Sequence, residues 1–231
     1  MNLFCFPFAG ANKYSYNQFI PHLAKGITLH TLELPGRGRR IREPGITDIH
    51  EMAADLYQMI HKNLFRPYAL YGHSMGTILA YLVIKKIIRD GLPLPVYLFV
   101  SGRGGPAAPE KKLNRYLLPR DEFIAELREM GGSPDEVLND DVLMDFFEPI
   151  LRADFSAIEQ YRYEETAPFP IPILAMAGLE EKITMDELAA WQKETTRKAE
   201  LTNFTGKHFF IYEHVQELAH LINTRLSNYR S

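Results

Sequence analysis

A serine between two glycines is the clearest candidate for chemistry in this chain. The run LYGHSMG at 70–76 contains the pattern G-x-S-x-G, centred on Ser74. At a strand-to-helix turn this pattern lifts a serine hydroxyl above the sheet, and flanking glycines avoid the clash that larger residues would cause. An apolar run precedes the pattern and a helical one follows it. We therefore predict a nucleophile at Ser74 rather than a turn that merely needs small residues, with the Met75 amide directed at a developing oxyanion.

A serine nucleophile needs a general base, and the chain offers eight histidines. Four precede the turn, which does not fit the chain order of nucleophile, acid and base. His73 belongs to the turn itself and is expected to pack beneath it, while His214 and His220 lie in or beside the last predicted helix. His208 differs because it follows the last predicted strand and opens a loop at the carboxyl edge of the sheet. We predict that His208 is the base.

The acid that orients the imidazole should follow the preceding strand, predicted at 173–177. The residues after it are Gly178-Leu179-Glu180-Glu181, and the first aspartate, Asp186, is expected to begin the next helix. A glutamate can orient an imidazole and stabilise its cation. Either Glu180 or Glu181 is predicted to serve, and the residues alone leave the choice open.

Two further loops are candidates for contacts with a substrate. The small residues of FCFPFAGA, after the first predicted strand, would let a backbone amide approach a substrate, so Ala9 is predicted as the second oxyanion donor. The arginine-rich segment at 36–42 is interpreted as a charged surface loop rather than a phosphate site. Its G-x-G, like that at 102–105, completes no dinucleotide or P-loop pattern.

Composition excludes several classes of function. The chain has 231 residues, 46% of them hydrophobic, and a formal net charge of −3, so it can bury a large core and carries no basic excess for nucleic acid or an acidic membrane. The single cysteine, Cys5, lies in an apolar run and is expected to be a buried, inert thiol. The first residues are not expected to act as a signal peptide, and the longest fully apolar run, 78–84, is too short to span a bilayer. A cytoplasmic protein is expected.

Short apolar runs alternate with longer helical patterns along the chain. Strand–helix alternation with continuously apolar strands predicts an α/β fold: a mostly parallel sheet with helices on both faces. The predicted strands are 2–6, 28–33, 68–71, 96–101, 173–177 and 201–204. The predicted helices outside the insertion described next are 16–23, 49–64, 75–89, 186–195 and 215–226.

One stretch, at about 103–168, contains no convincing strand. It holds only helical patterns, at 120–130, 134–138 and 140–161, and prolines punctuate both of its ends. We interpret it as a helical lid inserted into a single domain that covers residues 1–231. Apolar residues at helical spacing, including Phe146, Phe147 and Leu151, either pack this lid onto the core or line an acyl channel.

Several motifs together resemble one known family. They are FCFPFAGA, ELPGRGRRIREP, YGHSMG, LFVSGR, LPRDEFIAELREMGGSP, LRADFSAIEQYRY, ELAAW and GKHFFI. With these motifs the chain resembles, nearly end to end, the type II thioesterases. These are discrete α/β-hydrolases that accompany nonribosomal peptide synthetases and polyketide synthases.

The resemblance implies a function and a set of partners. It implies hydrolysis of acyl groups from the 4′-phosphopantetheine arm of carrier proteins, which clears misprimed or stalled modules. It implies no cofactor of the enzyme's own, a mobile helical lid, and a Ser–His–acid triad in which Ser74 and His208 match the motifs. Ala9 and Met75 fall where the family's oxyanion amides lie. Acyl or peptidyl carrier proteins are the expected partners, with no nucleic acid and no membrane, and we expect a monomer.

The acid departs from the family pattern, which usually has aspartate. Counting back from ELAAW favours Glu180, whereas counting forward from Gly178 favours Glu181, and Glu180 is preferred here. Two other functions compete with the editing thioesterase. A carboxylesterase or acyltransferase for small diffusible esters would need no carrier, and a non-catalytic binding protein would not react with a fluorophosphonate at Ser74.

Overall fold

A single parallel sheet forms the centre of the molecule. In the computed structural model, which describes residues 1–109 and 113–229, six strands lie in the order β2-β1-β3-β4-β5-β6, and every neighbouring pair is parallel. The strands are β1 (Asn2–Phe6), β2 (Thr28–Thr31), β3 (Tyr68–His73), β4 (Tyr97–Ser101), β5 (Ile173–Gly178) and β6 (Glu200–Phe204). Because all strands run the same way, the loops that follow them meet at one edge of the sheet. The α/β fold predicted from the alternation is confirmed.

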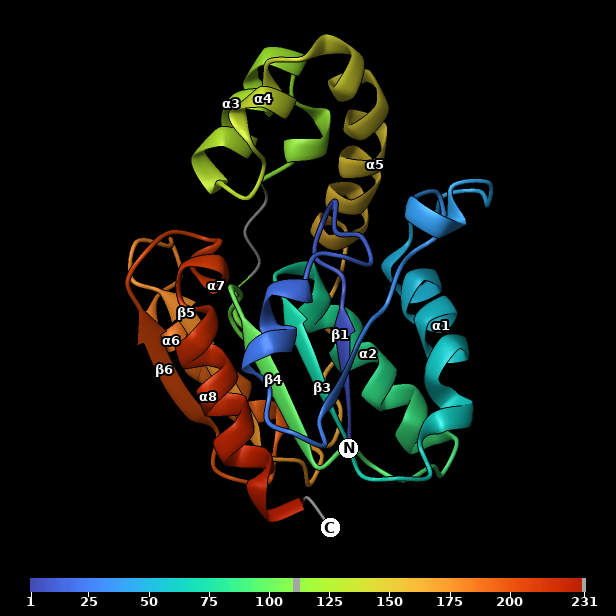
Figure 1. Ribbon diagram of the computed structural model, residues 1–231, viewed down its shortest axis with the longest axis vertical. Coiled ribbons are helices and arrows are strands. Elements are labelled where there is room, and N and C mark those ends of the chain that lie inside the picture. Colours follow the sequence, from blue (N-terminus) through green and yellow to red (C-terminus); the bar gives the residue numbers. More distant parts are fainter. Residues whose placement is uncertain (110–112, 230–231) are drawn as a thin grey trace.

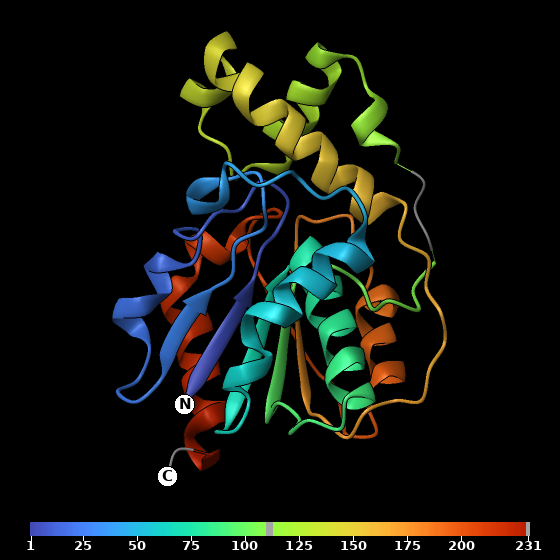
Figure 2. The same cartoon turned by 90° about the vertical axis from the view of Figure 1, so that its right-hand side faces the viewer.

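Helices cover both faces of the sheet, and each face has its own hydrophobic core. On one face α1 (Ile49–Ile60) and α2 (Met75–Arg89) pack on alternate strand residues such as Leu70 and Val100. On the other face α8 (Val215–Leu226) packs on the intervening residues, such as Tyr71. This period of two explains why every residue of β3 is buried. Figures 1 and 2 show the two helical layers.

The described part of the connection from β4 to β5 consists of helices joined by loops. It contains η4 (Arg115–Leu117), α3 (Arg120–Met130), α4 (Asp135–Leu138) and α5 (Asp141–Glu159), which we call the helical cap. The cap lies beyond the carboxyl ends of the strands (Figures 1 and 2) and has a small apolar cluster of its own, built around Phe123 and Phe155. Residues 110–112 of the predicted insertion, and 230–231 of the predicted domain, lie outside the described residues.

Some predicted elements differ in detail. The predicted helix 16–23 is a 3₁₀ helix, η1 (Asn17–His22), with Pro21 inside it. The predicted helix 186–195 divides into α6 (Met185–Ala189) and the 3₁₀ turn η5 (Ala190–Glu194). A short helix, α7 (Phe210–Glu213), follows His208, where only a loop was expected. In the described part of the chain, no helix has the length and apolar character that crossing a membrane requires.

Candidate active site

The turn that carries Ser74 is strained and closely packed. Ser74 has φ 52° and ψ −118°, a conformation that residues with a side chain rarely adopt. A Cβ on Gly76 would lie 2.5 Å from the Phe6 carbonyl oxygen, and one on Gly72 would collide with the Gly76 carbonyl. Glycine is therefore required on both sides. The sheet fixes the turn through the Ser74 amide, which donates to the Ser101 carbonyl over 2.8 Å.

His208 lies on the loop after β6 and forms a short hydrogen bond with a carboxylate. Its Nδ1 is 2.6 Å from Oε1 of Glu181, on the loop after β5. The other carboxylate oxygen accepts from the Gly178 amide at 2.7 Å, so the side chain is fixed at both ends and only 4% exposed. Nε2 of His208 is buried and has no hydrogen-bond partner among the described residues. An imidazole held at Nδ1 can accept a proton at Nε2, the nitrogen that the histidine of a catalytic triad presents to its serine.

Of the two candidate acids, the structure brings only Glu181 to the histidine. Glu180 is exposed, and it is the backbone amide of Glu180 that donates, to the Gly206 carbonyl at 3.1 Å. The geometry thus favours Glu181 over the preferred Glu180. The tight turn closed by the Glu181 amide on the Gly178 carbonyl, at 3.1 Å, turns the second glutamate inward and the first outward.

Two backbone amides are free to bind an oxyanion. Met75 is the first residue of α2, where helix amides lack an intrahelical acceptor. Ala9 lies in the turn after β1, closed by the Ala11 amide donating to the Phe8 carbonyl at 2.9 Å. Within the described residues, neither the Ala9 nor the Met75 amide has a hydrogen-bond acceptor. Gly10, by contrast, donates its amide to Asp154.

A second serine–histidine pair lies beneath the site. Nδ1 of His73 is 2.9 Å from Oγ of Ser101, which also bonds to the Tyr71 hydroxyl at 2.9 Å. His73 and Ser101 are fully buried, so a substrate cannot reach them. Burial, with a smaller contribution from the nearby His208, holds the pKa of His73 well below its ordinary value. The pair therefore packs under the turn as a neutral network, with the ring of His73 4.8 Å from that of His208.

Two cavities of different character meet at Ser74 and His208. The larger, of about 330 Å³, is lined by glycines of the β4 loop and by charged residues, including Arg115 and Lys182. The smaller, of about 170 Å³, lies between the cap and the β1 loop and is mostly apolar, with Phe8, Leu127 and Phe147 among its walls. Glycine at position 102, where φ is 67°, is needed because a Cβ there would collide with the His73 ring.

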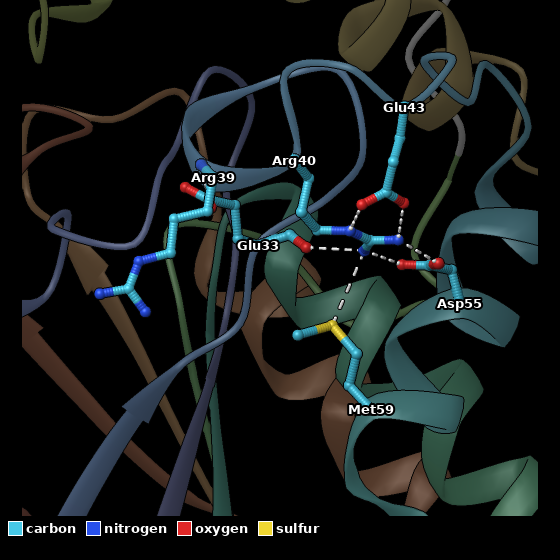
Figure 3. Close-up of polar contacts among 6 residues, drawn as sticks. All are labelled: Glu33, Arg39, Arg40, Glu43, Asp55 and Met59. Atoms are coloured by element: carbon cyan, nitrogen blue, oxygen red, sulfur yellow. Dashed lines mark hydrogen bonds and ion pairs between the residues drawn. The ribbon is translucent and has the colours of Figure 1, made fainter.

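Two arginines of the arginine-rich loop after β2 form ion pairs that hold the loop against the rest of the fold. The guanidinium of Arg40 contacts Glu43 at 2.6 Å, Asp55 at 2.5 Å and the Glu33 carbonyl at 3.0 Å, whereas the side chain of Arg39 points away from this group (Figure 3). Arg37 is buried and pairs with Asp154 of α5. The interpretation as a surface loop is therefore wrong for Arg37.

Sequence reasoning missed Asp154 altogether. The signal was present, because this aspartate shares the apolar face of the α5 pattern with Leu151, Phe155 and Ile158, all of which are buried. A charge at such a position is uncommon unless it has a partner.

Comparison with known proteins agrees with this geometry. The family model described as "Thioesterase domain" matches residues 1–226. The chain belongs to the thioesterase family. Its sequence is 35% identical to the gramicidin S biosynthesis protein GrsT of Aneurinibacillus migulanus over 219 residues, 94% of this chain and 86% of that one.

Solved structures of the same family superpose closely. ClbQ from the colibactin pathway is 33% identical, with a TM-score of 0.92 over 98% of this chain and 97% of that one. YbtT, the type II thioesterase of the yersiniabactin pathway, is 26% identical, with a TM-score of 0.89 over 100% and 94%. The resemblance to type II thioesterases is confirmed, and this thioesterase has their α/β-hydrolase fold. As a member of the thioesterase family, the protein is a hydrolase.

Proposed function

We propose that this type II thioesterase removes acyl or aminoacyl groups from the 4′-phosphopantetheine arm of carrier proteins in the cytoplasm, clearing misprimed or stalled modules of a peptide synthetase or polyketide synthase. The observation that carries the proposal is the meeting of two unlike cavities at Ser74 and His208. An apolar acyl group suits the smaller cavity, and a long polar arm suits the larger one. The thioester that joins them would then lie beside the nucleophile.

The reaction proceeds in two steps, acylation of Ser74 and hydrolysis of the acyl-enzyme. Ser74 Oγ attacks the thioester carbonyl while His208 Nε2 takes its proton, and the C–S bond breaks as the imidazolium returns that proton to the pantetheine sulfur. Water then attacks the acyl-serine with His208 as base again, releasing a carboxylic acid and free Ser74. Glu181 holds the imidazole through Nδ1 and stabilises its cation. The amides of Ala9 and Met75 stabilise the oxyanion in both steps.

The helical cap is proposed to be a lid over the acyl cavity. Its residues Leu127 and Phe147 form walls of the smaller cavity, whose opposite wall is the β1 loop with Phe8 and Ala9. An acyl chain must therefore pass between the cap and the sheet edge. Opening of the cap on the microsecond-to-millisecond scale would gate that entry.

Hydrolysis of loaded carriers tests the proposal. The enzyme is given a panel of acyl-loaded peptidyl and acyl carrier proteins, together with the p-nitrophenyl esters of the same acyl groups, and kcat/KM is compared for each acyl group. We expect the carrier-bound thioester to be the better substrate in each pair. Efficient hydrolysis of the free esters with no turnover of loaded carriers would instead indicate a carboxylesterase for small diffusible esters.

A further inference from the structure

A buried aspartate of the cap holds the loop that carries an oxyanion donor. Asp154, in the C-terminal half of α5, is fully buried. Its Oδ2 accepts from the Gly10 amide at 2.8 Å and from Nη1 of Arg37 at 2.6 Å, while Oδ1 accepts from Nη2 of Arg37 at 2.8 Å. One carboxylate thus joins the cap, the β1 loop and the β2 loop.

Stability alone is a poor explanation for this arrangement. Removing two charges from water is costly, and replacing a buried ion pair with apolar residues of similar volume is often neutral or stabilising. The position lies on the apolar face of α5, where a leucine would extend the cluster formed with Leu151 and Phe155. The feature that a leucine could not reproduce is the hydrogen bond to Gly10.

That hydrogen bond fixes the peptide next to the proposed oxyanion donor. The Gly10 amide and the Ala9 carbonyl belong to one planar trans peptide, so holding the N–H on Asp154 turns the Ala9 carbonyl the opposite way. Gly10 has φ 77°, and a Cβ there would lie 2.6 Å from Cδ2 of Leu151, so α5 also lies directly on this peptide. With the Gly10 amide engaged, Ala9 supplies the free amide of this loop.

We propose that Asp154 is a positioning residue of the oxyanion hole: it orients the Ala9–Gly10 peptide and so couples the helical cap to the reactivity of Ser74. Arg37 neutralises the carboxylate and holds it in place. The β2 loop that carries Arg37 is in turn joined to the β1 loop by Glu33, whose side chain accepts from the amides of Lys13 at 3.0 Å and Arg39 at 2.9 Å. The inference rests on the role proposed for Ala9.

The decisive variant removes the ion pair without leaving a buried charge unpaired. In the double variant Asp154→Leu with Arg37→Met, the pair is replaced by apolar side chains and Gly10 loses its acceptor. We expect the melting temperature to stay near that of the wild type while kcat falls about 10²-fold, the loss that a misplacement of about 1 Å causes in an active site. KM should change little, because the donor acts on the transition state.

The measurements distinguish a positioning role of Asp154 from a loss of correctly folded enzyme. Active sites are counted by complete labelling with a fluorophosphonate, so kcat refers only to competent enzyme. An alkyl boronic acid, which forms a tetrahedral adduct on a catalytic serine, should lose affinity in proportion to kcat. The substrate is a short p-nitrophenyl ester, which needs no carrier, so failure of the carrier proposal leaves this test intact. A double variant with wild-type kcat and boronate affinity would overturn the proposal.

Single variants complete the design. Asp154→Asn keeps an oxygen for the Gly10 amide but disturbs the Arg37 pair, so we expect a lower melting temperature and a smaller fall in kcat than the loss of an oxyanion donor causes. If the double variant does not fold, Asp154→Asn is compared with Asp154→Ala, which removes the acceptor. A kcat per active site about tenfold or more lower in Asp154→Ala than in Asp154→Asn supports the proposal, and equal kcat in the two variants overturns it. Asp55→Asn is the matched control: it breaks the Arg40 pair without touching Gly10 and should lower only the melting temperature.

Discussion

Two adjacent glutamates have opposite environments, which makes the triad acid directly testable. Glu181 contacts His208 and Gly178 and is nearly buried, whereas Glu180 is exposed at the edge of the larger cavity. We expect Glu181→Gln to lower kcat by roughly 10²–10⁴-fold, because the imidazole loses both its orientation and its stabilising charge. Glu180→Gln, the matched control, should stay near wild type. Equal small losses in kcat/KM for the two variants would assign the role to another carboxylate.

The burial of His73 should make the protein less stable as the pH falls. Burial lowers its folded-state pKa below the ordinary 6.5, so the unfolded chain binds the proton more readily than the folded one. Stability that is fully present above about pH 6.5 is therefore lost as the pH falls, by up to about 1.4 kcal/mol per unit for this one group, until the folded-state pKa is reached. His30 also has a lowered pKa, through its own burial, but it is common to both proteins compared below.

The measurement compares the wild type with His73→Asn. Urea unfolding at pH 7 and at pH 5 gives the free energy of unfolding of each protein. We expect the variant to be less stable at pH 7 but to lose less stability on acidification, because its amide cannot take up a proton. The same loss in both proteins would show that His73 does not titrate on unfolding.

At the scale of elements, the cap and the β1 loop together determine the space for the acyl group. Phe147 lines the smaller cavity, whereas its neighbour Phe146 is 51% exposed and lies outside it, so the acyl contact expected of Phe146 is not supported. We expect Phe147→Ala to raise kcat/KM for long acyl chains relative to short ones by about tenfold, as a pocket change of a few methylene groups does. The gain should come with some loss of thermal stability.

Phe146→Ala is the matched control for this change. It removes the same side chain from the next position of α5 and should leave the chain-length preference unaltered. Acyl-loaded carriers of two lengths provide the rates, and thermal unfolding provides the stabilities. If Phe147→Ala only lowers the melting temperature, the residue serves packing alone.

The elements themselves were largely predictable, because local pattern determines them. Continuous apolar runs such as that of β3 require a sheet covered on both faces, and the cap helices α3 and α5 follow their amphipathic spacing. The short helix α7 was missed because it is a single turn, too short for periodicity to detect.

The part of the site that the sequence did not predict depends on contacts between residues far apart in the chain. Asp154 and Arg37 are separated by 117 positions, and no local pattern records such a pairing. The choice between Glu180 and Glu181 likewise depends on a turn of four residues, 178–181, which directs adjacent side chains to opposite sides. Spacing places both glutamates on the loop, but only the backbone path decides which one faces His208.

At the scale of the whole molecule, five loops from different strands converge at one edge of the sheet. These loops follow β1, β3, β4, β5 and β6, and the parallel order of the strands brings them together. They carry the proposed oxyanion donor, nucleophile, glycine opening, acid and base. An acyl group is proposed to pass from a carrier to Ser74 at this edge.

Rapid-quench mass spectrometry tests that claim most directly. The enzyme is mixed with excess acyl-loaded carrier, quenched in acid at intervals and digested, and the peptide that contains Ser74 is examined for the acyl mass. We predict an adduct on Ser74 that forms before free acid is released and decays as the carrier is consumed, and that is absent in Ser74→Ala. Release of acid at the wild-type rate by Ser74→Ala, or an adduct on another residue such as Ser101, would contradict it.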